Sequence, residues 1–176
     1  MRKHRIIPTL LLTRNGLVKT RQFGDQTYIG DPLNTIRIFN EKFADEVIVL
    51  DIEASRLQHE PNLALIKNLA EECFMPFAYG GGITNVQQIA SLIRCGVEKV
   101  VINTALLSSY DLAFKAKNIF GSQAIVGSVD VVRNIRGGYE VVSKSATTKQ
   151  EVPLMVHLDN LVAAGVGEIM ITSVEN

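Results

Sequence analysis

Short apolar runs rich in β-branched residues alternate along the chain with longer segments in which apolar residues recur every three or four positions. The short runs predict strands, and the longer segments predict amphipathic helices. The predicted strands cover residues 6–12, 46–50, 76–79, 99–103, 124–129 and 168–172. Because these runs are almost wholly apolar, they are typical of parallel strands that are buried on both faces.

Each predicted helix opens with a capping residue or a proline, as helix starts commonly do. The helices are predicted to begin at Asp31-Pro32, Pro61, Thr84-Asn85 and Ser109, and a fifth covers residues 153–164. Before the fifth helix lies an irregular stretch, residues 131–148, which contains Arg136-Gly137-Gly138-Tyr139. Glycines between alternating residues predict a hairpin inserted after the fifth strand.

An internal repeat favours one architecture over another. Residues 43–49, 96–102 and 165–171 follow the same pattern, in which a helix ends, a small residue and an acid turn the chain, and an apolar strand begins. Repeated βα units predict a (β/α)8 TIM barrel in the α/β class. The competing doubly wound sheet would need G-x-G-x-x-G after its first strand, where Thr13-Arg14-Asn15-Gly16 stands instead.

The length of 176 residues predicts one domain, residues 1–176, with an apolar share of 47% that suits a sizeable core. Complete barrels of this kind need about 250 residues and eight strands. We therefore expect a partial barrel of about six strands, either cut short or completed by a partner. Its open edges make self-association an expectation.

Charge and composition narrow the functional classes. Eighteen basic residues balance eighteen acidic ones, so no net field attracts nucleic acid or an anionic membrane. The longest apolar run, residues 6–12, is too short to span a bilayer, and no signal peptide follows the basic start, which predicts a cytoplasmic protein. Cys73 and Cys95 are expected to stay reduced, and the three scattered histidines predict no metal site.

In such barrels the chemistry lies at the carboxyl ends of the strands. Gly80, Gly81 and Gly82 follow the third predicted strand and precede a helix, so their bare backbone N–H groups predict a phosphate site. The alternative is a glycine-rich turn that binds nothing. The other polar residues at strand ends predicted to bind substrate or phosphate are Asn103, Thr104, Thr172 and Ser173.

Two aspartates and a lysine are further candidates. Asp130 ends the fifth predicted strand and is interpreted as a general acid or base, with capping of the next loop as the alternative. Asp51 ends the second strand and either contacts substrate or caps the turn in DIEAS. Lys19, in a loop after the first strand, is a candidate catalytic cation or a solvated side chain.

Five ordered blocks of the sequence resemble the cyclase subunit of imidazole glycerol phosphate synthase. They are RIIPTLLLTRNGLVKT, GDPLNTIRIFNEKFADEVIVLDIEAS, PFAYGGGITNVQQIASLIRCGVEKVVINTA, FGSQAIVGSVD and GVGEIMITSVEN. The likeness covers essentially the whole chain and breaks off where the family continues into its last strands. It implies a (β/α)8 barrel that receives ammonia from a glutaminase subunit docked at the amino-terminal face.

The family reaction joins ammonia to a ribulosyl-formimino carboxamide ribotide and yields imidazole glycerol phosphate and aminoimidazole carboxamide ribotide. The resemblance implies no redox cofactor. The family's two catalytic aspartates end strands one and five, and the second corresponds to Asp130. The first falls on Leu11, which can neither donate nor accept a proton. General acid–base groups contribute about 10²–10⁴-fold to a rate, so this departure argues against the usual cyclisation.

The amino-terminal face of the barrel keeps the family's pattern. The charged ring at the family's ammonia entrance corresponds to Arg5, Glu46, Lys99 and, with an offset of one residue, Glu168. Glu98 resembles the family's acidic contact to the glutaminase. The alternative for this ring is a cluster of paired charges that serves stability alone.

Three hypotheses follow from these residues. The chain is a cyclase of histidine biosynthesis, an ammonia-channelling subunit that amidates a sugar for a surface polysaccharide, or an inactive barrel that serves as an assembly module. Leu11 argues against the first, and we expect the isolated chain to lack cyclase turnover with ammonium salts. The acceptor in each active hypothesis is a phosphorylated small molecule.

Overall fold

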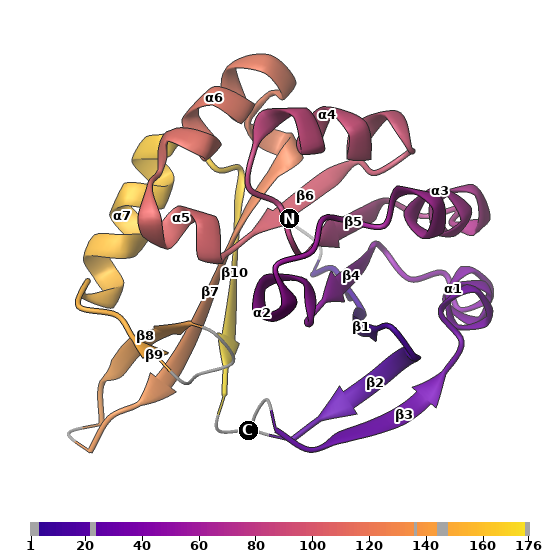
Figure 1. Ribbon diagram of the computed structural model, residues 1–176, viewed down its shortest axis with the longest axis horizontal. Helices are drawn as coiled ribbons and strands as arrows, with labels where there is room; N and C mark the ends of the chain where they lie inside the picture. The colour runs from indigo at the N-terminus through magenta and orange to yellow at the C-terminus, as the bar shows by residue number, and fades with distance from the viewer. Residues whose placement is uncertain (1–3, 22–23, 136, 144–147, 175–176) are drawn as a thin grey trace. The chain divides into compact units, whose positions relative to one another are not determined.

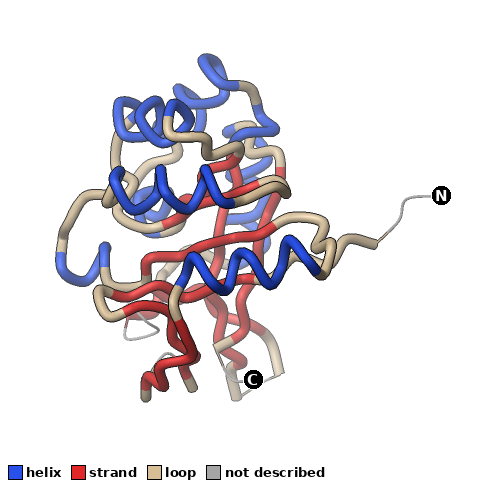
Figure 2. The backbone as a smooth tube through the Cα atoms, turned by 90° about the vertical axis from the view of Figure 1, so that its right-hand side faces the viewer, coloured by secondary structure: helices blue, strands red, loops and turns tan. Residues whose placement is uncertain are grey.

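A computed structural model describes residues 4–21, 24–135, 137–143 and 148–174. Strands and helices alternate along the chain, and Figure 2 shows this alternation in red and blue. The chain divides into two compact units. The first unit comprises Met1–Lys19, Thr27–Ile83 and Gln87–Val100, and the second comprises Thr20–Gln26, Thr84–Val86 and Val101–Asn176.

The first unit is built on three parallel strands, β1 (Thr9–Thr13), β4 (Val47–Asp51) and β5 (Phe77–Gly80). Leu11 pairs with Leu50, which in turn pairs with Gly80, so these residues share one face of the sheet. Next along the chain is β6 (Lys99–Ile102), and the N–H of Glu98 just before it donates to the carbonyl of Phe77. β6 therefore begins beside β5.

Four helices belong mainly to this unit: α1 (Pro32–Glu41), α2 (Ala54–Leu57), α3 (Leu63–Glu72) and α4 (Val86–Arg94). The carboxylate of Asp31 caps α1 by accepting the N–H of Asn34, as the sequence predicts. α1 and α3 lie next to each other (Figure 1). Arg37 of α1 pairs with Glu72 of α3 at 2.8 Å, which joins the middle of α1 to the last residue of α3.

The second unit is built on β7 (Ile125–Arg133) and the parallel strand β10 (Glu168–Ser173). β8 (Tyr139–Ser143) runs antiparallel to the end of β7, and β9 (Thr148–Lys149) pairs with β8. The helices are α5 (Thr104–Ser108), α6 (Asp111–Phe120), the 3-10 turn η1 (Ser122–Ala124) and α7 (Leu154–Ala164).

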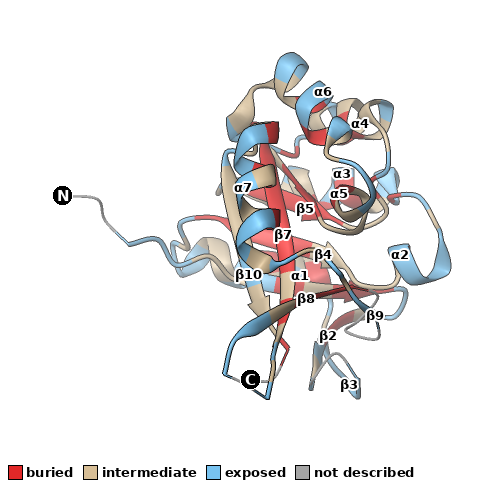
Figure 3. Ribbon diagram, turned by 90° about the vertical axis from the view of Figure 1, so that its left-hand side faces the viewer, coloured by how far each residue is buried: buried red, intermediate tan, exposed pale blue. Residues whose placement is uncertain are grey.

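The core consists of the parallel strands and the helix faces that cover them. Figure 3 shows β4, β5 and β7 buried, while the helices expose their outer faces. Val47, Val49 and Ile125 are fully buried, as expected of strands covered on both faces. The α/β class, the order of βα units and every predicted strand and helix are confirmed, with ends that differ by a few residues.

Two hairpins modify this plan. The predicted hairpin after the fifth strand is formed by β7 and β8, and Gly137 in its turn has a φ of +81°. Arg136, also predicted in this turn, lies outside the described residues. A second hairpin, β1 with β2 (Gly16–Thr20), continues to β3 (Gln26–Gly30), where the sequence interpretation placed a loop. Among the described helices, none is long and apolar enough to cross a membrane.

Candidate functional site

Three of the predicted site residues meet in the second unit. Asn103 follows β6, and its Nδ2 donates a hydrogen bond of 2.9 Å to Oδ2 of Asp130 on β7. Thr172 of β10 is in register with Asp130, so both side chains lie on the same face of the sheet. The sequence assigns phosphate binding to Asn103 and proton transfer to Asp130. The hydrogen bond thus brings together the two residues to which these roles are assigned.

Asp130 has the proton affinity of an acid–base group. Burial raises its pKa from 3.8 to about 6, against the opposing effect of the hydrogen bond from Asn103. A carboxyl group with a pKa near the working pH can both accept and release a proton during a reaction. The arrangement therefore fits general acid–base chemistry.

The expected position of Asp130 at the end of its strand is wrong. β7 continues to Arg133, because Val131 pairs with Val141 and Arg133 with Tyr139 of β8. Asp130 thus lies where the parallel pairing with β10 and the antiparallel pairing with β8 overlap. Ser173, a further predicted residue, ends β10 in register with Val131.

The backbone of the glycine turn, Gly80, Gly81 and Gly82, leaves no room for side chains at its last two positions. Gly81 and Gly82 have φ values of +126° and +68°, in the region that favours glycine. A Cβ on Gly81 would lie 2.6 Å from the carbonyl oxygen of Asp51, and one on Gly82 would lie 2.5 Å from that of His59. The bare backbone of the turn leads toward α4, which is the arrangement that suits an anion.

Thr104 and Asn103, the expected companions of the glycine turn, belong to the second unit. Thr104 is the first residue of α5, and Asn103 immediately before it bonds Asp130. The structure therefore gives Asn103 a partner that the sequence interpretation did not foresee.

Asp51 ends β4, as predicted, and closes the turn that follows. Its Oδ1 accepts the backbone N–H groups of Glu53 and Ala54 at 3.0 Å each. This is the capping role that the sequence left open beside substrate binding. The other carboxylate oxygen, Oδ2, lies 3.8 Å from Nε2 of His59.

The first strand carries no proton-transfer group in its apolar run. Leu11 lies between Leu50 of β4 and Val18 of β2 in the sheet. Lys19 was expected in a loop, and this expectation is wrong: Lys19 lies on β2, because the pairing of β2 with β1 orders this segment. Its side chain is exposed.

Three predicted gate residues form one contact in the first unit, here called the Glu46 cluster. The side chain of Glu46 is 2% exposed, and its Oε2 accepts from Nη1 of Arg5 at 3.0 Å and from Nζ of Lys99 at 2.7 Å. Arg5 precedes β1, Glu46 immediately precedes β4, and Lys99 begins β6. A nearly dry carboxylate is thus held by two cations at the amino ends of the strands.

The remaining predicted residues of that face keep their expected places along the chain. Glu98 is exposed immediately before β6, and Glu168 is the first residue of β10 in the second unit. Both stand at strand starts, as the sequence predicts.

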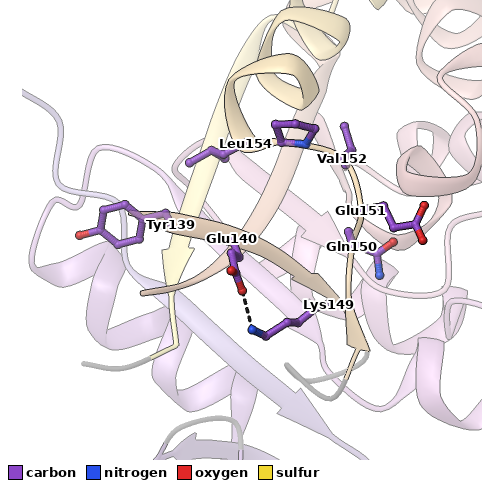
Figure 4. Close-up of a pocket in the computed structure, with 8 residues that line it drawn as sticks. Tyr139, Glu140, Lys149, Gln150, Glu151, Val152 and Leu154 are labelled. Carbon is purple, nitrogen blue, oxygen red and sulfur yellow. Dashed lines mark ion pairs between the residues drawn. The ribbon is translucent and has the colours of Figure 1, made fainter. Parts of the chain in front are cut away.

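A shallow cavity lies at the inserted hairpin (Figure 4). Its wall carries an ion pair of 2.6 Å between Nζ of Lys149 and Glu140. The lining residues are Tyr139, Glu140, Lys149, Gln150, Glu151, Val152, Pro153 and Leu154. None of them is a predicted site residue, so the cavity carries no part of the chemistry argued from the strand ends.

Sequence reasoning missed several polar contacts that depend on tertiary structure. His59, in the segment between α2 and α3, faces Asp51. Tyr79 on β5 is buried, and burial together with the charge of Asp51 raises its pKa. In the second unit the hydroxyl of Tyr110 lies 2.6 Å from Nδ1 of the buried His157. No local signal marks these residues.

Comparison with known proteins gives consistent results. The family model described as "Histidine biosynthesis protein" matches residues 5–176. The chain is 47% identical to a Pseudomonas aeruginosa protein named "Putative imidazole glycerol phosphate synthase subunit hisF2", over 99% of this chain and 70% of that protein. A Leptospira borgpetersenii protein named "Putative imidazole glycerol phosphate synthase subunit HisF" is 44% identical, over 99% and 69%. A Helicobacter hepaticus protein named "Imidazole glycerol phosphate synthase subunit HisF" is 33% identical, over 97% and 68%.

Proposed function

Because the chain belongs to the histidine biosynthesis protein family, which confirms the predicted barrel family, we propose that it is the synthase subunit of a glutamine amidotransferase complex. In this proposal a glutaminase supplies ammonia, and the chain adds it to a phosphorylated acceptor. The acceptor of the family reaction is the ribulosyl-formimino carboxamide ribotide. Neither a metal nor a redox cofactor takes part.

The observation that carries the proposal is the Glu46 cluster. Burying a carboxylate costs several kcal/mol unless cations pair with it. Arg5 and Lys99 supply that pairing from different strand starts, and the side chain of Lys99 is only 14% exposed. We interpret the cluster as an entrance whose paired charges open for neutral ammonia and exclude ions. Glu168, which begins β10 in the second unit, is retained as a proposed gate residue.

The surface near this cluster supports a protein partner. Three large apolar side chains are exposed on the segments that lead into β1, β4 and β5: Ile6, Phe43 and Phe74. The N–H of Phe74 donates to Oδ1 of Asn40, which fixes this segment against α1. Exposed apolar residues on ordered segments are typical of protein interfaces. We propose that the glutaminase covers them, with Glu98 as a polar contact.

The groups proposed for the reaction lie at or near the carboxyl ends of strands within each unit. In the first unit the glycine turn is proposed to hold a phosphate group, with Asp51 as a further binding group. In the second unit Thr104, Thr172 and Ser173 are the polar groups proposed to contact the acceptor. Ammonia adds to an electrophilic carbon, and the nitrogen that forms the new bond carries one proton too many. Asp130, oriented by Asn103, accepts that proton and returns it to the former carbonyl oxygen, which leaves as water when the C=N bond forms. In the family reaction the same nitrogen then attacks the formimino carbon, which closes the ring, and the C–N bond to aminoimidazole carboxamide ribotide breaks. Lys19 is proposed to offset negative charge on the acceptor.

A second candidate function is favoured by Leu11. A second acid–base carboxylate on β1 would assist ring closure, and Leu11 in the sheet between β2 and β4 cannot. Addition of ammonia to a sugar acceptor is not followed by ring closure, so Asp130 alone can accept the proton and return it. We therefore carry the sugar-amidating subunit of surface-polysaccharide synthesis as the alternative to the histidine-pathway cyclase.

One isotope experiment tests the proposal and separates the two acceptors. The chain and a class I glutaminase are supplied with glutamine labelled with ¹⁵N in its amide, in an excess of unlabelled ammonium. The acceptors are the formimino carboxamide ribotide in one reaction and a phosphorylated sugar in the other. We expect the product to retain the ¹⁵N label, and the acceptor that reacts identifies the pathway. A product labelled only at the level of the bulk ammonium would contradict ammonia transfer between subunits.

A further inference from the structure

The strongest unexplained feature of the first unit is the imidazole of His59. Its Nδ1 lies 3.1 Å from the carbonyl oxygen of Glu60, so this nitrogen carries hydrogen and donates it. Its Nε2 is enclosed by protein and has no hydrogen-bond partner among the residues that the structure describes. A buried nitrogen with an unused lone pair is rare in folded proteins, because it gives up water and gains nothing in return.

The group that faces this nitrogen is the carboxylate of Asp51, with Oδ2 at 3.8 Å. Oδ1 of Asp51 is already occupied by two backbone N–H groups, whereas Oδ2 has unused acceptor capacity. A neutral imidazole therefore presents a lone pair to an oxygen that needs a donor. A proton on Nε2 would convert this mismatch into a charge-assisted hydrogen bond.

Other charged or titratable groups around His59 have partners of their own. The carboxylate of Glu60 accepts from Nε2 of Gln88 on α4, and that of Glu53 pairs with Arg56 on α2. Tyr79 on β5 stays neutral, since burial and the charge of Asp51 raise its pKa. Asp51 is thus the charged group placed to respond to a proton on His59.

His59 and Asp51 are also the two residues against which the glycine turn is packed. The space where a Cβ of Gly81 would stand is filled by the backbone of Asp51, and at Gly82 by the carbonyl oxygen of His59. Because interiors are close-packed, a shift of the backbone of Asp51 or of His59 moves one wall of the turn. The pair is therefore mechanically coupled to Gly81 and Gly82.

We propose that His59 is a positioning residue for the glycine turn, and that a proton on its Nε2 pairs it with Asp51 and fixes the turn in its anion-binding form. The proposal rests on the anion site of the proposed function for its consequence, but the positioning itself is a property of the free protein. An imidazolium next to the turn also adds a positive charge that favours an anion.

The test is a pH titration followed by NMR, because histidine side chains change charge between about pH 5 and 8. In the free protein we expect the backbone amide signals of Gly81 and Gly82 to move together with the ring signals of His59. His59→Asn keeps a donor for the carbonyl of Glu60 but removes the titrating nitrogen, so these movements should vanish. His4→Gln, at an exposed histidine, is the matched control and should leave them unchanged.

A second readout uses sulfate, which keeps its charge across this pH range. We expect the affinity of the turn for sulfate to be at least about threefold higher at pH 6 than at pH 8. In His59→Asn the affinities at the two pH values should be equal. His59→Gln places a neutral donor near Oδ2 of Asp51 and should bind with an affinity that is independent of pH. It also serves if His59→Asn does not fold.

The outcomes distinguish the positioning role of His59 from the anion site of the proposed function. If Gly81 and Gly82 titrate independently of His59, or titrate in the same way in both variants, the positioning role is wrong. If they follow His59 but sulfate disturbs no signal of the turn at either pH, the positioning role stands and the anion site of the proposed function fails.

Discussion

Burial of Asp130 disfavours its ionised form, so the stability that this residue contributes depends on pH. Its pKa is about 6 in the folded protein against 3.8 ordinarily, so the folded state binds more protons between these values. The stabilisation from this group is full below pH 3.8 and is lost as the pH rises through 6. A shift of about two pKa units corresponds to roughly 3 kcal/mol at most.

Replacing the charge while keeping the shape should therefore stabilise the protein. Asp130→Asn retains an oxygen that can accept from Nδ2 of Asn103 and removes the ionisation. We expect the free energy of unfolding in urea to rise by about 1–3 kcal/mol at pH 8 and to change little at pH 4, with loss of synthase activity. Equal stabilisation at both pH values would show that ionisation of Asp130 is not the cause.

At the residue scale, the contacts that the sequence predicts best are those that follow from the arrangement of the strands alone. The charges of Glu46 and Lys99 stand at strand starts, and parallel strands bring their starts to one edge of a sheet, so their contact follows from the pattern. His59 gives no such signal. Its position depends on the loop after α2, where Gln58 adopts a left-handed backbone with a φ of +53°.

The glycine turn is the element whose geometry is most restrictive. Gly82→Ala would place a Cβ 2.5 Å from a backbone oxygen at a φ of +68°. We expect a loss of about 2–4 kcal/mol in the free energy of unfolding, because backbone strain and a steric clash act together. Gly138→Ala in the hairpin is the matched control, since its Cβ would meet the movable side chain of Asn134 at 3.2 Å. Similar losses in both variants would contradict this account of the turn.

A hydrogen bond connects the half-buried Tyr110, immediately before α6, with the buried His157 of α7. Tyr110→Phe removes the hydroxyl that lies 2.6 Å from Nδ1 of His157 and leaves this nitrogen unpartnered. We expect a loss of about 1–3 kcal/mol, measured by urea unfolding at pH 8. Tyr139→Phe, at a half-exposed tyrosine, should cost less than 0.5 kcal/mol, as is roughly usual for surface substitutions.

The same pair predicts how stability depends on pH. Burial lowers the pKa of His157 below its ordinary 6.5, so the unfolded chain binds more protons between the two values. The contribution of this histidine is full above pH 6.5 and is lost as the pH falls through the folded pKa. We expect the melting temperature to fall on acidification below pH 6.5 and the fall to be smaller in His157→Gln. The same fall in both proteins would exclude His157 as its cause.

The order of the strands and helices can be predicted from the sequence, because the spacing of apolar residues differs clearly between the two in this chain. Phe77–Gly80 is buried throughout and Val47–Asp51 over its first three residues, and both runs are too short for helices. β2 was missed because its only buried residues are Leu17 and Val18, and β3 because its residues are mostly exposed. Asn15-Gly16 between two apolar runs is nevertheless a hairpin signal. The extension of β7 to Arg133 is set by pairing with β8, which a single segment does not encode.

At the scale of the whole molecule, two groups of residues are proposed for two tasks. In the first unit the strand starts carry the Glu46 cluster and exposed apolar side chains, and the glycine turn follows β5. In the second unit Asp130 lies within β7, where the pairing with β8 begins. Under the proposed function, the first group of residues admits ammonia and Asp130 takes part in its use. We propose that Lys99 and Glu46 regulate the entry of ammonia and do not serve stability alone.

The most direct test compares wild type with Lys99→Ala in complex with the glutaminase. Two quantities are measured: the ratio of ammonia incorporated to glutamine hydrolysed, and the melting temperature. Lys67→Ala, which breaks an exposed pair with Glu71 of 3.8 Å, is the control and should change neither appreciably. Removing one partner of a buried pair costs about 3–5 kcal/mol, so the melting temperature of Lys99→Ala should fall in any case. If Lys99 and Glu46 regulate ammonia entry, the incorporation ratio falls as well, because ammonia escapes. An unchanged ratio in the destabilised variant would show that the pair serves stability alone.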